Sequence, residues 1–275
     1  MRLNLQSDIH GTSATLALTD FSGWSLRLGR RENARPFCNW HDFIMEKKYA
    51  VIVAGGSGSR AGGDVPKQFQ MLCGIPVVWW SIRAFHEEDP ETEIRVVLHP
   101  GYFELWDILA ADLPEEVRKI KVELVCGGRN RLESVKNGIT RIDPGKGAES
   151  LIAVHDAARP LVSKDLIKRG WEAARKTGAA IPVVAMTDSI RHLTHHGSEA
   201  LDRSRYVRVQ TPQVFYGDLL KEAYDRILLP EMTDDASVVE AGGKDIALYD
   251  GDEENMKITN PLDFKIAELL LEGKL

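Results

Sequence analysis

Residues 49–69 read YAVIVAGGSGSRAGGDVPKQF, and this stretch decides the fold. Tyr49 to Val53 are apolar and rich in β-branched side chains, which is typical of a short buried strand in a parallel sheet. The residues that follow have almost no side chain: Ala54, Gly55, Gly56 and Gly58. Their backbone can turn tightly and present N–H groups to an anion, and Arg60 and Lys67 then add two cations. The stretch predicts a strand that ends in a nucleoside triphosphate site.

Other interpretations of this glycine-rich loop fit less well. A dinucleotide fingerprint should open directly into a helix, but Gly62, Gly63 and Pro66 interrupt this loop. A Walker A loop needs Gly-Lys-Ser/Thr, whereas Lys67 stands between Pro66 and Gln68. A plain surface turn stays open from the loop alone, and the two cations argue against it.

Composition limits the class of protein. The 275 residues are 43% hydrophobic, and no stretch approaches the roughly 18 apolar residues that cross a membrane. A net charge of −6 argues against a nucleic-acid-coating surface. The three cysteines, Cys38, Cys73 and Cys126, are widely spaced, which favours a reducing compartment. We expect a soluble, cytoplasmic protein with no membrane and no nucleic-acid partner.

The first 44 residues differ from the rest of the chain. They mix polar residues with isolated aromatics, without sustained periodicity. Their longest apolar run is too short for a signal peptide, and four acidic residues weaken the case for a transit peptide. We therefore expect a poorly ordered N-terminal extension over residues 1–44 and a catalytic domain over residues 45–275, with Met45 as a plausible natural start.

From Tyr49 onward, strands and helices alternate, which predicts a doubly wound, mostly parallel α/β sheet. The rhythm changes over residues 186–209. There the segments 189–193 and 206–209 flank a polar turn that begins at His195, so we expect a protruding β-hairpin arm. An amphipathic ribbon of two strands is marginally stable alone, which favours packing of the arm on a second subunit.

Candidate site residues gather where ligands bind in such a sheet, beyond the carboxyl ends of the strands. Four stretches lie there: 55–67, 127–134, 155–160 and 255–260. Each is weak alone, because Asp156 could cap a helix, Lys257 could be a solvated cation and Ser134 could face water. Together they predict one pocket.

These stretches, with Asp202-Arg203, Gln210-Thr-Pro-Gln213 and Thr233-Asp-Asp-Ala236, resemble the 2-C-methyl-D-erythritol 4-phosphate cytidylyltransferase family of the non-mevalonate isoprenoid route. The likeness runs from about Lys47 to the C-terminus, and it implies a Rossmann-like nucleotidyltransferase fold. It also implies a homodimer that transfers CMP from CTP, with Mg²⁺, to a polyol phosphate.

The resemblance assigns roles to individual residues. Arg60 and Lys67 stabilise the transition state, whereas Arg203 and Lys257 position the sugar phosphate. CTP is held by Ala54, Gly55, Gly56, Gly58, Ser59, Gly128 and Ser134. The polyol phosphate site comprises Asp156, Arg159, Ser189 and Thr211, with Asp156 near the magnesium.

The chain departs from the family pattern at two positions. Ser189 stands where Thr is usual and keeps the hydroxyl, and Arg129 stands where an acidic residue is usual. Arg129 matters only if a side chain reads the base there. Two alternatives stay open, a ribitol-5-phosphate cytidylyltransferase and a catalytically silent nucleotide-binding module.

Overall fold

The computed structural model describes residues 46–56, 65–143, 149–226 and 232–273. The chain divides into two units, Met1–Asp42 and Phe43–Leu275, and every element below belongs to the second. The expected extension over residues 1–44 and three loop residues, Gly58, Ser59 and Arg60, lie outside the described residues. Within the described ranges, no helix is long and apolar enough to cross a bilayer.

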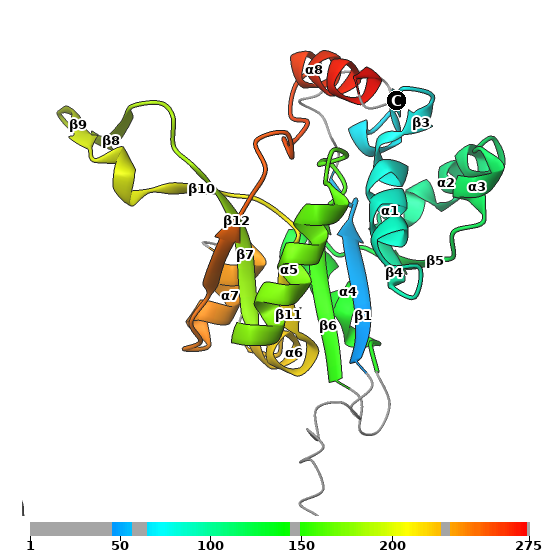
Figure 1. The fold of residues 1–275 in the computed structure, drawn as a ribbon, viewed down its shortest axis with the longest axis horizontal. Coiled ribbons are helices and arrows are strands. Elements are labelled where there is room, and N and C mark those ends of the chain that lie inside the picture. The colour runs from blue at the N-terminus through cyan, green and yellow to red at the C-terminus, as the bar shows by residue number, and fades with distance from the viewer. Residues whose placement is uncertain (1–45, 57–64, 144–148, 227–231, 274–275) are drawn as a thin grey trace, which may run out of the picture. The chain divides into compact units, whose positions relative to one another are not determined.

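The core of the fold is an eight-stranded sheet in the order β10-β7-β11-β6-β1-β4-β5, with β12 also paired to β7 (Figure 1). Its parallel centre comprises β1 (Glu46–Val53), β4 (Glu93–Leu98), β5 (Val122–Cys126) and β6 (Glu149–Asp156). The other strands are β7 (Ala179–Ala185), β10 (Val207–Val209), β11 (Gln213–Tyr216) and β12 (Ala247–Asp250). β12 runs parallel to β7, whereas β10 and β11 are antiparallel to their neighbours. The mostly parallel α/β fold expected from the sequence is confirmed.

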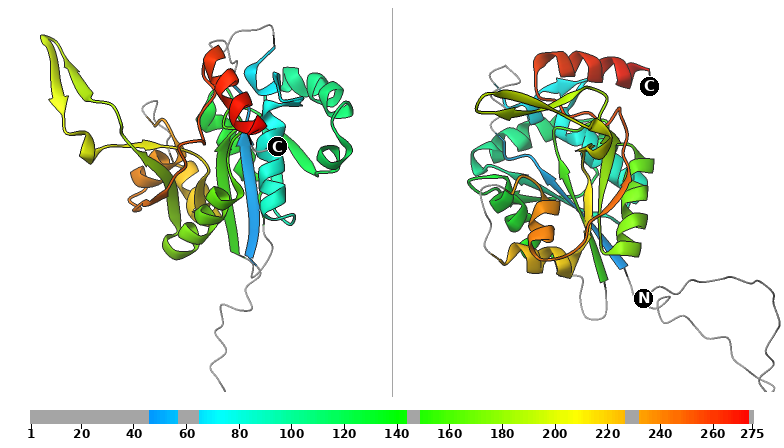
Figure 2. Two further views of the ribbon diagram at one scale, coloured as in Figure 1. Left: turned by 45° about the horizontal axis from the view of Figure 1, so that its top comes forward. Right: turned by 90° about the vertical axis from the view of Figure 1, so that its left-hand side faces the viewer.

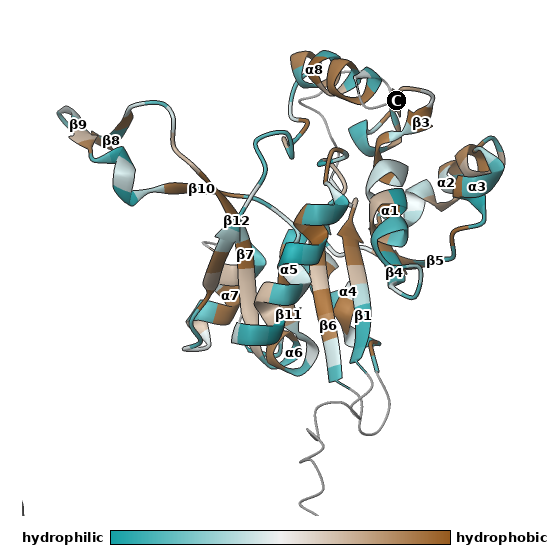
Figure 3. Ribbon diagram, viewed as in Figure 1, coloured by the Kyte–Doolittle hydropathy of each residue, from teal (hydrophilic) through white to brown (hydrophobic). Residues whose placement is uncertain are grey.

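Helices cover both faces of this sheet (Figure 2). One face carries α1 (Val77–Glu88) and α5 (Lys164–Thr177), and the other carries α4 (Arg131–Thr140), α6 (Gly217–Tyr224) and α7 (Asp235–Ala241). Successive side chains of a strand point to opposite faces, so Ala50 and Ile52 join one core while Tyr49 and Val51 join the other. This explains why residues 49–53 of β1 are apolar without alternation; the colouring of β1 in Figure 3 runs from hydrophilic at its start to hydrophobic at its end.

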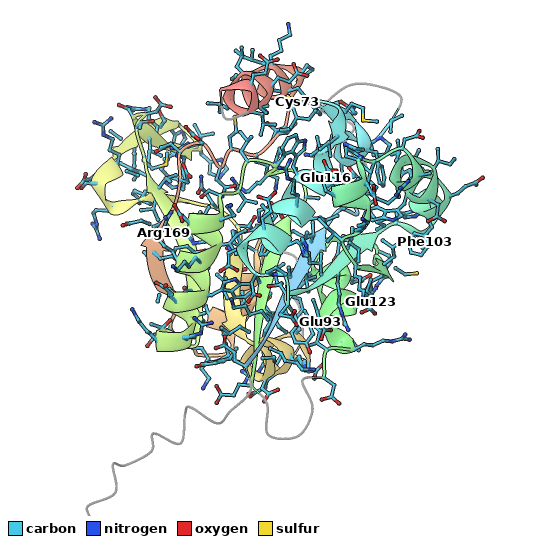
Figure 4. All side chains as sticks on the ribbon, turned by 45° about the vertical axis from the view of Figure 1, so that its right-hand side comes forward. Cys73, Glu93, Phe103, Glu116, Glu123 and Arg169 are labelled. Carbon is cyan, nitrogen blue, oxygen red and sulfur yellow. The ribbon has the colours of Figure 1, made fainter. Side chains whose placement is uncertain are left out.

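Smaller elements surround the sheet. They are η3 (Lys67–Phe69), β2 (Met71–Leu72), β3 (Ile75–Pro76), η4 (Pro100–Tyr102), α2 (Phe103–Ala111), α3 (Glu115–Arg118) and α8 (Pro261–Glu272). Trp79 of α1 stacks on Trp106 of α2, with ring centroids 4.0 Å apart. Arg169 of α5, labelled in Figure 4, donates its Nε to the Asp250 carbonyl of β12 at 3.2 Å. The ring stacking ties α2 to α1, and the hydrogen bond ties α5 to β12.

The helix caps follow the sequence closely. Ser163 precedes α5 and caps it by accepting the Leu166 N–H at 3.1 Å, a role for which serine is favoured. Asn260 and Asp263 form a reciprocal capping box around Pro261 at the start of α8. Local hydrogen bonds therefore fix where α5 and α8 begin.

The arm differs in detail from its prediction. β8 (Ile190–Thr194) pairs with β9 (Gly197–Leu201), and η5 (Arg203–Arg205) follows. The segment near Tyr206 was expected to pair with the first arm strand, and this is wrong, because Val207–Val209 instead pair with β7. Only two residues separate Thr194 from Gly197, so the tight turn gives the first strand its partner immediately. Figures 1 and 2 show the hairpin extending away from the sheet.

Candidate active site

A cavity of about 420 Å³ opens at the carboxyl ends of β1 and β6. The register of the two strands pairs Val53 with Asp156, so the glycine-rich loop and the acidic residue leave the sheet side by side. Its lining comes from four separate stretches: 53–56, 67–68, 128–134 and 156–158, together with Lys257. The position matches the general rule that parallel sheets bind ligands beyond their carboxyl ends.

Gln68 holds the start of the glycine-rich loop in place. Its side chain is 2% exposed, and its Nε2 donates to the carbonyl oxygens of Ala54 at 2.7 Å and Gly56 at 3.0 Å. Two backbone oxygens are thereby bound to an internal donor, which lowers the electrostatic repulsion that an incoming phosphate would meet. The side-chain amide of Gln68 therefore makes this loop a more favourable site for a bound anion.

The turn after β5 forms the opposite wall. Gly128 donates its N–H to Ser134 Oγ at 3.0 Å, and Ser134 Oγ donates to the Asn130 carbonyl at 2.8 Å. A Cβ added at Gly128 would lie 2.3 Å from Glu133 Cβ, so only glycine fits this turn. Asn130 also caps α4 by accepting the Glu133 N–H at 2.8 Å. Ser134 thus fixes the shape of the wall.

Two lysines approach the cavity from distant parts of the chain. Lys67 Nζ donates to the Ile258 carbonyl at 2.8 Å, and Lys257 Nζ donates to Asp156 Oδ2 at 2.7 Å. The loop that carries Lys257 is attached to the sheet, since the Ile258 N–H donates to the Ala158 carbonyl at 2.8 Å. Both ammonium groups therefore lie at the part of the cavity wall that residues 257–258 form with Asp156.

Asp156 is an ionised carboxylate between two cations. Its Oδ1 lies 3.3 Å from Arg131 Nε, and its Oδ2 binds Lys257. Burial alone would raise the pKa of Asp156, but the neighbouring charges of Arg131 and Lys257 outweigh burial and lower it well below its usual range. Burial alone would lower the pKa of Arg131, but the negative charges of Asp235 and Asp156 outweigh burial and raise it.

His155 is linked to the Asp156 backbone through the Thr211 hydroxyl. Its Nε2 lies 3.1 Å from the Arg159 carbonyl, which can only accept, so Nε2 carries the proton and Nδ1 accepts from Thr211 Oγ1 at 3.1 Å. The same Thr211 oxygen accepts the Asp156 N–H at 3.1 Å. Burial lowers the pKa of His155 to about 4, so the ring is neutral at pH 7.

The structure brings together part of the predicted residue set. The predicted residues that line the cavity are Ala54, Gly55, Gly56, Lys67, Gly128, Ser134, Asp156 and Lys257. Thr211 and Arg159 lie behind this wall: Thr211 bonds the Asp156 backbone, and Arg159 donates to the Asn255 carbonyl at 2.8 Å. Arg129 also lines the cavity, where its side chain pairs with Glu133.

Ser189 and Arg203 belong to the arm and do not line this cavity. Arg203 donates to the Thr187 carbonyl at the base of the arm. Arg60, Gly58 and Ser59 fall outside the part of the chain that the structure describes, so their roles stay predictions.

Sequence reasoning gave no role to Arg131, Gln68 or Asp235. Arg131 lies three residues after Gly128, and Asp235 lies in the Thr233-Asp-Asp-Ala236 motif, so both stand in stretches that the sequence singles out. Arg131 forms two hydrogen bonds to Asp235, at 3.1 and 2.7 Å, across 104 residues of sequence. Only the folded chain reveals this pairing.

The donor set suits a divalent ion that is shared with a bound phosphate. Among the described residues, no group of three or more His, Cys, Asp and Glu side chains could hold a metal by itself. Mg²⁺ usually binds through one or two carboxylates and takes its other ligands from water and substrate phosphates. Asp156, which is ionised and lines the cavity, is suited to such a site.

A glycine-rich loop, two lysines and an ionised aspartate at the carboxyl ends of a parallel sheet define a class: an α/β protein built to bind a nucleotide. Comparison with known proteins gives the family. The family model described as "IspD: 2-C-methyl-D-erythritol 4-phosphate cytidylyltransferase" matches residues 49–273.

The 2-C-methyl-D-erythritol 4-phosphate cytidylyltransferase of Phocaeicola vulgatus is 44% identical over 224 residues, covering 82% of this chain and 99% of that protein. The protein of the same name from Bacteroides thetaiotaomicron is 43% identical over 225 residues, covering 82% and 100%. The crystal structure of that enzyme from Thermus thermophilus aligns with a TM-score of 0.62 at 30% identity, covering 81% and 98%. The chain belongs to the 2-C-methyl-D-erythritol 4-phosphate cytidylyltransferase family.

Proposed function

We propose that this protein transfers CMP from CTP to 2-C-methyl-D-erythritol 4-phosphate and releases diphosphate. Membership of the family supports the reaction. The observation that carries the proposal is the cavity itself, which is lined by Gly55 and Gly56 together with Lys67 and Lys257. Such a site suits two polyanions that must approach each other.

The chemistry needs little acid–base catalysis. A phosphate monoester has a second pKa of about 6, so its oxygen is already an anionic nucleophile at neutral pH. That oxygen attacks the α-phosphorus of CTP, a new P–O bond forms, and the bond between the α-phosphorus and the bridging oxygen breaks. The electron pair leaves with diphosphate. The main barrier is charge repulsion, which explains a cavity without a general-base histidine among its described lining residues.

The residues of the chain reduce this repulsion. Lys67 and Lys257 bring positive charge to the phosphates, and preorganised donors of this kind stabilise a phosphoryl-transfer transition state by several kcal/mol. Ser134 and the Gly128 turn hold the wall that receives the base. Arg60 would add a third cation, as the sequence predicts.

Magnesium fits this proposal. Asp156 would supply the protein ligand, and the ion, when bound, would neutralise charge on the triphosphate. Lys257 would then exchange its contact with Asp156 for a substrate phosphate, since its side chain is 42% exposed.

We also propose that the protein acts as a homodimer in the cytoplasm. The β8–β9 hairpin forms a two-stranded sheet of its own, and hairpins of this size gain stability on another surface. Ser189 and Arg203 would then serve the cavity of the partner subunit. Cys73 and Cys126 are free thiols, which agrees with a reducing compartment.

A diphosphate-release assay tests the reaction. The protein is incubated with CTP, Mg²⁺ and either 2-C-methyl-D-erythritol 4-phosphate or ribitol 5-phosphate. We expect release with the first substrate to exceed release with the second by at least about 100-fold in kcat/KM. Faster turnover of ribitol 5-phosphate would assign the chain to the alternative reaction. No turnover of either would indicate a silent nucleotide-binding module.

A further inference from the structure

Arg131 connects the cavity to a buried acid on another helix. It is the first residue of α4, and its guanidinium donates to both carboxylate oxygens of Asp235, the first residue of α7. The Asp235 side chain is 0% exposed. The same guanidinium reaches into the cavity wall, where its Nε lies 3.3 Å from Asp156 Oδ1. One side chain therefore links a buried anion to an anion at the site.

Asp235 is a firmly held anchor. Tyr224 donates its hydroxyl to Asp235 Oδ1 at 2.6 Å, and the Asp235 N–H donates to Gln213 Oε1 at 3.0 Å. The Gln213 amide also donates to Asp234 Oδ2 at 2.8 Å, which ties the start of α7 to β11. A buried carboxylate is costly unless it is paired, so its loss of Arg131 would be strongly unfavourable. Arg131 is consequently fixed.

The two cations on Asp156 differ in freedom. Lys257 is 42% exposed and makes a single contact with this carboxylate through a flexible stem. Arg131 is 26% exposed and is bound in a two-point fork by Asp235. A substrate phosphate can draw Lys257 away, whereas Arg131 can turn only if Asp235 is left unpaired. Asp156 thus has one exchangeable partner and one permanent partner.

We propose that Asp235 is a positioning residue of this site, which holds Arg131 against Asp156 and keeps its guanidinium off the phosphates of CTP. Asp156 then keeps its orientation when Lys257 turns to the substrate. The inference rests on the proposed function, because it assumes that a triphosphate enters this cavity.

The substitution Asp235→Asn removes the negative charge of the anchor but keeps its size. The released guanidinium of Arg131 then binds the triphosphate unproductively. We expect the Kd for CTP to fall on the order of 3- to 10-fold, because one more cation contacts the phosphates. We expect kcat to fall on the order of 100-fold, because Asp156 loses its orientation. A merely structural defect would weaken binding as well as turnover.

Asp225→Asn is the matched control, since this carboxylate follows Tyr224 on the surface, is 78% exposed and pairs with Lys136 rather than with Arg131. It should leave both constants within about twofold of wild type. If Asp235→Asn does not fold, Tyr224→Phe replaces it. That variant removes one hydrogen bond from Asp235, and it should shift Kd and kcat in the same directions by smaller factors.

A double-mutant cycle tests whether Asp235 acts on CTP binding and turnover through Arg131. In an Arg131→Gln background, Asp235→Asn should change neither kcat nor the Kd for CTP, measured by calorimetry, by more than about twofold. Losses that multiply in the double variant would overturn the proposal, as would weaker CTP binding by Asp235→Asn alone. Wild-type turnover tests the proposed function separately. If the wild type is inactive, the cycle on CTP binding alone still decides the positioning role.

Discussion

The cavity and the arm are built in opposite ways. Three charged side chains of the cavity are held by partners far away in sequence: Lys67 by the Ile258 carbonyl, Asp156 by Lys257, and Arg131 by Asp235. The arm is a local hairpin in which β8 pairs with β9, separately from the main sheet, and Leu193 is 79% exposed. These three cavity side chains are held by their own subunit, whereas the arm exposes a large apolar side chain, Leu193, to solvent.

This difference gives the two regions different expected responses to mutation. Cavity variants should lose activity within their own subunit. Arm variants should lose activity only through a second subunit, and they should be rescued by one that carries an intact arm.

The largest effect is expected for Lys67→Ala. Removing this cation takes positive charge from the phosphates, so kcat/KM should fall by more than about 100-fold. The lost hydrogen bond to Ile258 should cost only about 1 kcal/mol, a Tm shift of about 3 °C. Lys119→Ala, which removes a surface lysine paired with Glu115, is the control and should keep full activity. Near-normal turnover by Lys67→Ala would reject the role.

The second prediction concerns the arm. Arg203→Ala should be inactive alone but should recover activity when mixed with Lys67→Ala, since a mixed dimer has one site with both residues intact. Random exchange makes half of the dimers mixed, so about a quarter of wild-type activity should return. The recovery should be followed over time after mixing. Subunit exchange verified by mass spectrometry with no recovery would contradict a shared site.

The third prediction is a pH dependence of stability set by His155. Its pKa is lowered to about 4 by burial, from an ordinary value of 6.5, so the unfolded chain binds a proton that the folded chain does not. The stabilisation is complete above the unfolded pKa and is lost as pH falls toward the folded one. Between about pH 6.5 and about pH 5, the free energy of unfolding should drop by about 2 kcal/mol from this group.

Urea unfolding of His155→Gln measures that contribution. The variant should be less stable at neutral pH, and its stability should fall less steeply than that of wild type over the same range. His192→Gln, at an exposed arm position, should keep the wild-type slope. Equal slopes for wild type and His155→Gln would show that the buried ring is not the titrating group.

The smallest effect is expected from removal of residues 1–44. The sequence places the catalytic domain after this segment, and the second structural unit begins at Phe43. A chain that starts at Met45 should match the full chain in Tm and in CTP turnover. A Tm lower by several degrees would make the segment part of the domain.

The sequence predicted the frame of the molecule because its signals are local. The strand expected over Tyr49–Val53 lies within β1, Glu46–Val53, and the caps at Ser163 and Asn260 depend on residues within one turn. The glycine-rich loop and Asp156 could be placed together, since parallel strands end at the same edge.

The network behind the cavity could not be predicted in the same way. Asp235 is buried and accepts the Tyr224 hydroxyl of α6, and its pairing with Arg131 spans 104 residues. The arm pairing also depended on the tight turn before Gly197, which alternation alone does not reveal. Contacts of this kind are decided by tertiary packing rather than by spacing.

A crystal structure with CTP and Mg²⁺ tests the central claim most directly. We expect the triphosphate against Gly55, Gly56 and Lys67, and the cytosine against the Gly128 turn. Arg131 should still contact Asp235, while Lys257 should have moved toward a phosphate. CTP bound in another cavity, such as the one between Trp80 and Leu161, would contradict the account.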